Sequence, residues 1–422
     1  MFPAFLYLAT ITEYAFNLSL YLLLLMWVNK NKKKILRAVE KFGTPLYIYS
    51  EENLLKQIAE YKKAFRGIDV LFCYALKANS NRHLCSLIAG RGFGADVVSG
   101  GELRAALSSG FRPEKIIFSG VGKTEEELAL ALRKNIFFIN VESFEELEKL
   151  DETASRLGKR ADFSIRINPD VDPHTHNYIA TGKSGSKFGV DFEEASRMYS
   201  WARKRVRLNA VSAHFHLGSQ LFSPVPYRKA FKKLLKFVSS LEKSGINLKS
   251  LDIGGGWGVK EGLDMGSPAV IAEIIRPYAG KYSFIMEPGR SVTASSGILA
   301  ARALYRKTSG KRNIVILDAA MNDFIRPSLY GASHPVLNLS GGKGKKVRAD
   351  IAGPVCESGD FFLKDFKTVL PERGDVLVIL SAGAYGYSMS SNYNLRPKPA
   401  EVLLKKSGVR LIRKRQSYPE II

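Results

Sequence analysis

The sequence predicts an α/β fold in which a closed (β/α)8 barrel is joined to a second, mostly β domain. Two observations predict it. Between residues 70 and 290, eight apolar segments rich in β-branched and aromatic residues alternate with segments of helical periodicity. After residue 290, long β-type segments follow one another without regular helices. With 422 residues, the chain is long enough for two such domains.

The predicted barrel strands are short and mainly apolar, and amphipathic helical segments separate them. Some of these segments open with a capping residue, as Ser143 does before Phe144-Glu145-Glu146-Leu147. An open doubly wound sheet is the alternative, and the count of eight strands favours the barrel. The strands are predicted at residues 71–78, 94–99, 115–119, 137–141, 162–168, 210–217, 250–254 and 283–287.

The second domain is predicted from five β-type segments, at residues 298–305, 313–318, 346–351, 375–381 and 401–413. Another β run, Pro45-Leu46-Tyr47-Ile48-Tyr49, precedes the barrel, and we expect it to pair with the C-terminal sheet. The expected organisation is therefore an N-terminal extension (1–34), a strand and helix packing with the β domain (35–66), the barrel (67–295) and the C-terminal β domain (296–422).

The N-terminal extension is largely apolar up to Val28, and a lysine-rich run follows it. A membrane span needs about 20 apolar residues, and polar residues interrupt this stretch. Three interpretations stay open: a membrane anchor, a start assigned too far upstream, or an apolar arm that packs on the protein. We favour a dispensable extension, so that membrane contact through residues 1–28 is not needed for function.

Charge and cysteine content limit the class of protein. Lysine and arginine number 63 against 40 acidic residues, a net charge of +23. The basic residues are scattered without a nucleic-acid motif, so we expect either a generally basic surface or a preference for anionic substrates, and no nucleic-acid partner. The three cysteines (Cys73, Cys85 and Cys356) are too few for a disulfide framework and show no zinc spacing. They favour a reducing compartment, the cytoplasm, and no metal site is predicted.

Polar residues stand where six of the predicted barrel strands end, which is the face that carries the reactive groups in such barrels. Lys77 comes first, and an amine at the mouth of a buried strand is costly unless it is paired, deprotonated or covalently occupied. A lysine that extends to the surface is the alternative. The others are Asp96, Ser99, Arg166, Asn168, His214, His216, Ser219, Gly254-Gly255-Gly256 and Glu287-Pro288-Gly289-Arg290. Together they indicate one pocket.

The residue types at these strand ends suit pyridoxal phosphate. Lys77 offers an amine for its aldehyde, and the Gly254–Gly256 backbone offers amides for its phosphate. Glu287 can hold a protonated ring nitrogen, and His216 can stack on a flat ring. Each has a simpler interpretation: a tight turn for the glycines, a structural partner of Arg290 for the glutamate, and a core histidine.

Seven motifs in a fixed order extend this interpretation over residues 43–404. They are Tyr74-Ala75-Leu76-Lys77-Ala78-Asn79, His174-Thr175-His176 with Lys187-Phe188-Gly189, His214-Phe215-His216-Leu217-Gly218-Ser219-Gln220, Glu287-Pro288-Gly289-Arg290, Met321-Asn322-Asp323-Phe324-Ile325-Arg326-Pro327, Cys356-Glu357-Ser358-Gly359-Asp360 and Gly383-Ala384-Tyr385. The chain thereby resembles the fold-type III pyridoxal-phosphate decarboxylases, and among them most closely the diaminopimelate decarboxylase family.

The resemblance implies a TIM barrel with a β domain of the alanine racemase and ornithine decarboxylase type. It implies that a homodimer with shared active sites converts meso-diaminopimelate to L-lysine and CO2. Lys77 would hold the cofactor covalently, and Cys356, from the partner subunit, would return the proton. The other implied cofactor contacts are Asp96, His216, Ser219, Gly254, Gly255, Gly256, Glu287, Gly289, Arg290 and Tyr385. The implied substrate contacts are Arg290, Arg326, Tyr330, Glu357 and Tyr385.

Other functions stay open on the same scaffold. A decarboxylase of another diamino acid, of the ornithine or arginine type, would not need Arg326 and Glu357 to bind a far carboxylate and amine. A catalytically silent pyridoxal-phosphate protein would lack the β domain and the Cys356 segment. A racemase would use a tyrosine from the second domain where this chain has a cysteine.

Overall fold

The structure is a computed structural model of the chain, and it describes residues 24–172, 181–183, 185–258, 268–342 and 344–422. These residues form two compact units. The barrel unit contains the described residues of Ile58–Gly258 and Gly266–Gly289. The β domain contains those of Met1–Gln57 and Arg290–Ile422.

Eight parallel strands close the barrel, because the first of them, β2, pairs with the last, β9, from Val70↔Phe284 to Phe72↔Met286. This closure confirms the predicted barrel and excludes the open doubly wound sheet. The strands are β2 Val70–Ala75, β3 Gly94–Val97, β4 Ile116–Phe118, β5 Phe138–Val141, β6 Ala161–Arg166, β7 Leu208–His214, β8 Ser250–Gly255 and β9 Ser283–Glu287.

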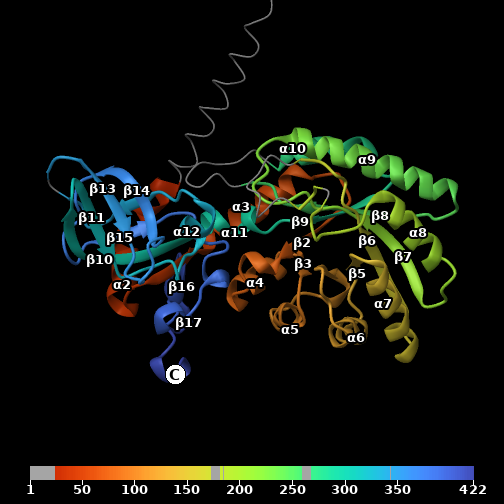
Figure 1. Cartoon of the computed structure of the whole chain (residues 1–422), viewed down its shortest axis with the longest axis horizontal. Helices are drawn as coiled ribbons and strands as arrows, with labels where there is room; N and C mark the ends of the chain where they lie inside the picture. The colour runs from red at the N-terminus through yellow and green to blue at the C-terminus, as the bar shows by residue number, and fades with distance from the viewer. Residues whose placement is uncertain (1–23, 173–180, 184, 259–267, 343) are drawn as a thin grey trace, which may run out of the picture. The chain divides into compact units, whose positions relative to one another are not determined.

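Helices lie outside the ring of barrel strands (Figure 1). Their starts follow local sequence: Thr124 and Glu127 form a capping box before α6, and Ser143 accepts the Glu146 amide proton at the start of α7, as predicted. Each helix buries one apolar face. The helices are α3 Glu51–Ala64, α4 Arg82–Ala89, α5 Gly100–Ser108, α6 Glu125–Lys134, α7 Phe144–Arg156, α8 Phe192–Ala202, α9 Pro224–Lys243 and α10 Ala269–Ile275.

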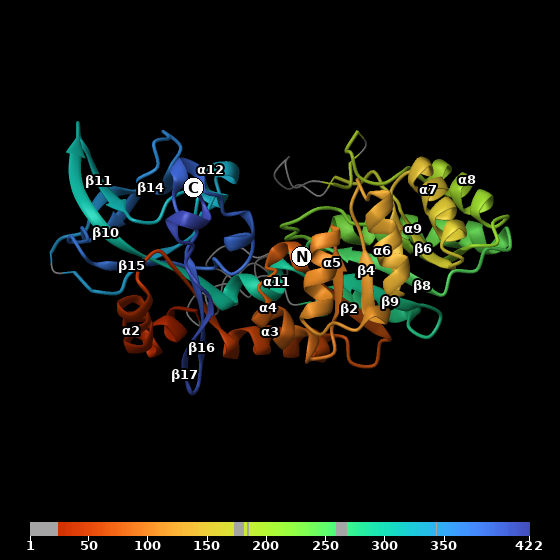
Figure 2. The same cartoon turned by 90° about the horizontal axis from the view of Figure 1, so that it is seen from below.

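The β domain is built on a nine-stranded sheet, with the order β14-β13-β11-β10-β1-β16-β17; in addition, β15 pairs with β10, and β12 pairs with β15. The long strand β10 and its neighbour β11 are labelled in Figure 2. The expected pairing of the first strand is confirmed, since β1 is antiparallel to β10 and parallel to β16. The strands are β1 Leu46–Ser50, β10 Gly297–Ser309, β11 Arg312–Leu317, β12 Val336–Asn338, β13 Val347–Ala352, β14 Phe361–Thr368, β15 Val376–Ile379, β16 Ala400–Lys405 and β17 Gly408–Arg413.

Three details of the β domain differ from the prediction. The segment 401–413 is a hairpin, because Lys406 and Ser407 turn the chain between β16 and β17. Strands β12 and β14 were not predicted: β12 is very short, and β14 is half exposed and interrupted by charges. The expectation of no regular helices was wrong for the short helices α11 (Arg290–Thr293) and α12 (Arg326–Tyr330).

Part of the N-terminal extension packs against the β domain. Residues 24–30 are helical and precede α2 (Lys32–Phe42), and Leu24, Trp27 and Val28 are buried in the core beneath β1, β10 and β16. For these residues the packing favours the interpretation as an apolar arm. Residues 1–23 lie outside the described part. Within the described part, no helix has the length and apolar character of a membrane span.

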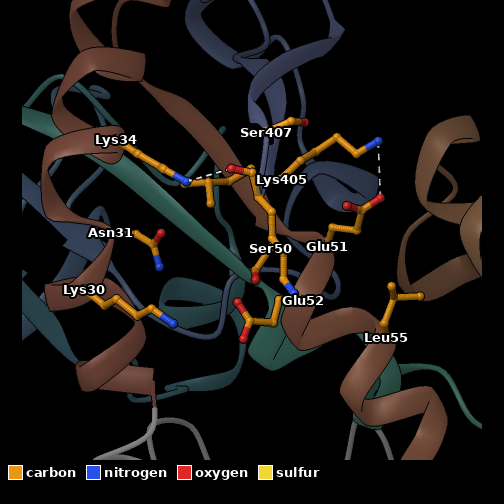
Figure 3. A pocket seen from close by; sticks show the side chains of 11 residues that line it. Lys30, Asn31, Lys34, Ser50, Glu51, Glu52, Leu55, Lys405 and Ser407 are labelled. Carbon is orange, nitrogen blue, oxygen red and sulfur yellow. Dashed lines mark hydrogen bonds and ion pairs between the residues drawn. The ribbon is translucent and has the colours of Figure 1, made fainter.

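The β domain also has a surface cavity of about 840 Å³, bordered by α2, the start of α3 and the β16–β17 hairpin (Figure 3). Lys30, Lys34 and Lys405 reach into it, and Lys34 donates a hydrogen bond to the Lys406 carbonyl. Lys405 pairs with Glu51 across the cavity at 3.4 Å. None of the predicted site residues lines this cavity.

Candidate active site

Lys77 is held against a buried carboxylate just beyond the end of β2. The strand stops at Ala75, and a 3-10 turn (Leu76–Ala78) places the Lys77 Nζ 3.0 Å from Asp96 Oδ2 on β3. The register that pairs Ala75 with Asp96 brings these two side chains together. The Lys77 side chain is 34% exposed, whereas Asp96 is buried. Burial and the nearby Glu287 raise the pKa of Asp96, although the Lys77 ammonium opposes the shift.

Glu287, the last residue of β9, is buried between two histidines. Its Oε1 lies 3.4 Å from His214 Nε2, and its Oε2 lies 3.4 Å from His216 Nδ1. Burial raises the pKa of Glu287, but His214 and Lys77 outweigh burial and hold this pKa well below its usual range. Glu287 is therefore an ionised carboxylate in a dry site.

The pKa values of the two histidines are shifted in opposite directions. Burial lowers the pKa of His214, but the carboxylates of Asp252 and Glu287 outweigh it and raise the pKa above its usual value. Burial lowers the pKa of His216 to about 4. The Gly255 N–H donates to His216 Nδ1 at 3.1 Å, so this nitrogen carries no proton. His216 is thus a neutral, flat ring beside Glu287, as its predicted stacking role requires.

A polar network behind Glu287 was not predicted from the sequence. Asn140 Nδ2 donates to Ser119 Oγ at 3.1 Å and to Asp252 Oδ2 at 3.3 Å. Ser119 Oγ in turn donates to Glu287 Oε1 at 3.5 Å. In the sequence, the members of this network could be noticed only as single polar residues inside or at the end of apolar strands. His214, Asp252 and Glu287 hold their ligand-type atoms within 4.8 Å of one another, and the Asp252 and Glu287 oxygens already accept hydrogen bonds within this network.

The Gly254–Gly256 turn has a backbone that only glycine suits. Gly254 and Gly256 have φ values of +63° and +87°. A Cβ on Gly255 would lie 2.1 Å from the Glu287 carbonyl oxygen, and one on Gly256 would lie 1.8 Å from that of Gly218. Strand β8, β9 and the loop after β7 therefore meet backbone to backbone, beside His216 and Glu287. Such a turn can hold a phosphate close to its amides.

Two other predicted residues of the barrel unit, Ser219 and Gly289, lie just after barrel strands. Ser219 lies half-buried in the loop after β7. Gly289 follows β9, and a Cβ there would lie 3.1 Å from that of Ala75 and 3.2 Å from that of Ala78. The predicted motif at residues 174–180 lies outside the described residues, so its histidines are not placed.

In the β domain, two arginines stack on the tyrosines predicted with them. The Arg290 guanidinium lies 4.5 Å from the ring centroid of Tyr385, and that of Arg326 lies 5.6 Å from the ring of Tyr330. Both arginines are buried. Arg326 opens the short helix α12, and Tyr330 ends it one turn later. A buried guanidinium on an aromatic ring suits the recognition of a carboxylate or phosphate.

Cys356 and Glu357 lie exposed on the loop between β13 and β14. The Cys356 amide donates to Asn394 Oδ1 at 2.9 Å. Asp360 braces the loop from behind, because its carboxylate accepts from the amides of Met321 at 2.7 Å and Val355 at 2.9 Å. Cys356 is the exposed one of three free cysteines, so its thiol is accessible on this unit.

The barrel residues fit pyridoxal phosphate on three observations. Lys77 offers a partly exposed amine, and Glu287 offers a buried, ionised acceptor for a protonated ring nitrogen. The close-packed glycine turn provides backbone that a Cβ would obstruct. The amine, the acceptor and the turn all lie at the C-terminal ends of the barrel strands.

Comparison with known proteins supports this fit. Residues 51–294 match the family model for the pyridoxal-binding domain of pyridoxal-dependent decarboxylases. The chain is 47% identical to the diaminopimelate decarboxylase of Aquifex aeolicus, over 91% of this chain and 92% of that one. It is 45% identical to that of Helicobacter pylori strain J99, over 90% of this chain and 95% of that one. The chain belongs to the diaminopimelate decarboxylase family.

Solved structures agree with this family membership. The crystal structure of diaminopimelate decarboxylase from H. pylori, complexed with L-lysine, matches with a TM-score of 0.88 at 44% identity, covering 91% of this chain and 97% of that one. A lysine/ornithine decarboxylase from Vibrio vulnificus matches with a TM-score of 0.79 at 21% identity, which shows the shared fold alone. The family's barrel and β domain are thus both present in this chain.

Proposed function

We propose that the protein removes one carboxylate of meso-diaminopimelate to give L-lysine and CO2, with pyridoxal phosphate as its cofactor. The observation that carries the proposal is the amine of Lys77 at the same barrel end as the ionised Glu287. Family membership supports the substrate. The reducing compartment expected from three free cysteines suits a cytoplasmic enzyme.

In the barrel unit, Lys77, Asp96, His216, Ser219 and Glu287 would hold the cofactor, together with Gly254–Gly256 and Gly289. When bound, pyridoxal phosphate supplies an aldehyde that captures an amino group and a ring that accepts electrons from the breaking bond. Glu287 would hold the proton of the ring nitrogen at its carboxylate, and His216 would cover the ring with a neutral face. Asp96 would keep the Lys77 amine in place.

In the β domain, Arg290 and Tyr385 would contact the phosphate and the substrate, while Arg326, Tyr330 and Glu357 would bind its far end. Arg326 suits the far carboxylate, and Glu357 suits the far amine. In the reaction the bond from Cα to its carboxylate breaks and CO2 leaves. Cys356 of the partner subunit would then donate its thiol proton to Cα, so that the atoms balance.

A CO2-release assay tests the substrate. The purified holoenzyme should release CO2 from meso-diaminopimelate, with no comparable release from ornithine, arginine or lysine. Arg326→Lys should raise KM for diaminopimelate at least ~10-fold, because a point charge replaces a planar two-pronged donor. Faster turnover of ornithine or arginine than of diaminopimelate would instead favour the second candidate function, a decarboxylase of another diamino acid.

Subunit mixing tests the shared site of the proposed homodimer. Lys77→Ala and Cys356→Ala should each be inactive alone. After 1:1 mixing and reassociation, about a quarter of the wild-type activity should return, because half the dimers then carry one intact site. Mixing Lys77→Ala with Glu287→Gln is the matched control: both residues belong to one barrel, so no activity should return. Recovery in neither mixture would contradict the shared site.

A further inference from the structure

Arg326 is held by a buried histidine that the sequence motifs did not single out. The Arg326 Nε lies 3.3 Å from His334 Nε2, and the two side chains are 3% and 1% exposed. Arg326 stands at the start of helix α12, and His334 lies in the segment between α12 and β12. The contact therefore joins the start of α12 to the loop that follows this helix.

The partners of His334 decide which ring nitrogen carries its proton. His334 Nδ1 lies 2.9 Å from the Leu380 carbonyl oxygen, which can only accept a hydrogen bond. Nδ1 is therefore the protonated nitrogen, and Nε2 is free of a proton in the neutral ring. Since the Arg326 Nε–H can only donate, it donates to His334 Nε2. Burial, with Arg326 and Arg290 nearby, lowers the pKa of His334 to about 3, in agreement with a neutral ring.

The imidazole of His334 contacts Arg326, the Leu380 carbonyl and the Phe324 ring. Leu380 directly follows β15, and its N–H donates to the Pro335 carbonyl at 2.9 Å, beside the bond that His334 makes to the Leu380 carbonyl. The Phe324 ring packs edge-on against the imidazole, with 4.6 Å between ring centroids. The β12–β15 pair thus holds the histidine, and the histidine holds the arginine.

A neutral acceptor suits an arginine that must keep its charge. The Nε–H lies in the guanidinium plane, so fixing it sets the orientation of that plane. A carboxylate in this place would also fix it, but it would neutralise the positive charge. The imidazole orients the guanidinium and leaves the charge available to an anion.

We propose that His334 is a positioning residue that orients the Arg326 guanidinium toward the far carboxylate of the substrate, and so contributes to specificity for amino acids that carry a second carboxylate. The proposal rests on the substrate-binding role of Arg326 in the proposed function. His334 itself acts through Arg326 and does not need to touch the substrate.

Two amide substitutions separate the two hydrogen bonds of His334. In His334→Gln, the amide oxygen reaches the position of Nε2 and can still accept from Arg326. In His334→Asn, the shorter amide reaches only the position of Nδ1, so it can keep the bond to Leu380 but loses the one to Arg326. We expect His334→Asn to raise KM for meso-diaminopimelate ~10-fold with kcat changed less, and His334→Gln to raise KM less than ~3-fold.

A double-mutant cycle in the holoenzyme closes the test. If His334 acts through Arg326, His334→Asn should add no further rise in KM on the Arg326→Lys background. An additive rise, equal effects of Asn and Gln, or a loss confined to kcat would overturn the proposal. If Arg326→Lys alone leaves KM unchanged, then Arg326 does not bind the substrate. This failure of the proposed function is thereby distinguished from a failure of the proposed role of His334. Should the Asn variant not fold, a KM for His334→Gln as high as that for Arg326→Lys would overturn the proposal.

Discussion

At the scale of single residues, the pKa values of two carboxyl groups in one buried cluster are shifted in opposite directions. Burial raises the pKa of both Glu287 and Asp252. His214 and Lys77 bring that of Glu287 well below its usual range, whereas that of Asp252 stays well above, because the Glu287 charge adds to burial. Glu287 is therefore ionised at neutral pH, and Asp252 is the weaker acid of the two. Environments that push two neighbouring pKa values apart assign different roles to the two groups.

Amide substitutions should separate these roles. Glu287→Gln removes the charge that would stabilise a protonated ring nitrogen, so we expect kcat to fall about 10²- to 10³-fold. Asp252→Asn replaces the carboxyl group of raised pKa with a neutral amide that can still accept the Gly254 N–H, so kcat should fall less than ~10-fold. CO2 release at saturating cofactor and substrate measures both. A larger loss for Asp252→Asn than for Glu287→Gln would contradict this assignment of roles.

The sequence revealed some of these residues and not others, for a physical reason. Lys77 and Glu287 could be predicted because each ends an apolar run, and the barrel fold then assigns both to one face. Asn140 and His334 could not, because their significance comes from partners that lie far along the chain or in an irregular loop. A single polar residue in a strand indicates a buried group without naming its partner.

At the scale of elements, the Gly254–Gly256 turn holds β8, β9 and the loop after β7 at backbone distance. Gly256 and Gly280 have nearly the same positive φ, +87° and +90°. A Cβ on Gly256 would collide with the Gly218 carbonyl, whereas a Cβ on Gly280 would meet nothing within 4 Å. Substitutions at these two glycines therefore separate the energetic cost of the backbone conformation from that of a steric collision.

Alanine at these two glycines should therefore have different effects. Gly280→Ala should lower the free energy of unfolding by about 1 kcal/mol, the cost of a left-handed conformation, and leave cofactor affinity unchanged. Gly256→Ala must also displace the turn, so the Kd for pyridoxal phosphate should rise at least ~10-fold. Titration of the apoenzyme with the cofactor measures the Kd. Equal cofactor affinity in the two variants would show that the turn is not part of the phosphate site.

Elements were predictable from the sequence where burial dictates their pattern. Strands buried on both faces in a parallel barrel read as continuous apolar runs, and all eight were predicted to within a few residues. Strand β14 was not predicted, because Lys364, Asp365 and Lys367 interrupt the alternation of apolar and polar residues in this half-exposed edge strand. Edge strands carry such charges because they limit pairing with other chains.

At the scale of the whole molecule, the fold does not by itself select the substrate. The V. vulnificus lysine/ornithine decarboxylase matches nearly the whole chain with a TM-score of 0.79, yet only 21% of residues are identical. Function is decided by the groups placed on the shared scaffold. Under the proposed function, Arg326 and Glu357, and not the barrel, would decide between diaminopimelate and other diamino acids.

Stability is also a property of the whole molecule, and one buried acid should make it depend on pH. Asp323 is 1% exposed and accepts the Ala320 N–H at 2.9 Å. Burial raises its pKa to about 7, whereas an aspartate in the unfolded chain has a pKa of about 3.9. Between these two values the folded protein holds a proton that the unfolded chain has released. The Asp323 contribution to stability must then decrease as the pH rises, and become constant above about pH 7.

Asp323→Asn removes this ionisation and keeps an oxygen for the Ala320 amide. The variant should therefore gain stability relative to the wild type by about 1.4 kcal/mol per pH unit between about pH 4 and 7, about 4 kcal/mol in all. Urea unfolding of both proteins at several pH values from 4.5 to 8 gives the difference, in which the pH dependence of the other groups cancels. If the difference stays constant over that range, Asp323 does not hold its proton in the folded protein. If it decreases as the pH rises, the carboxylate is instead stabilised on folding, which its buried position does not predict.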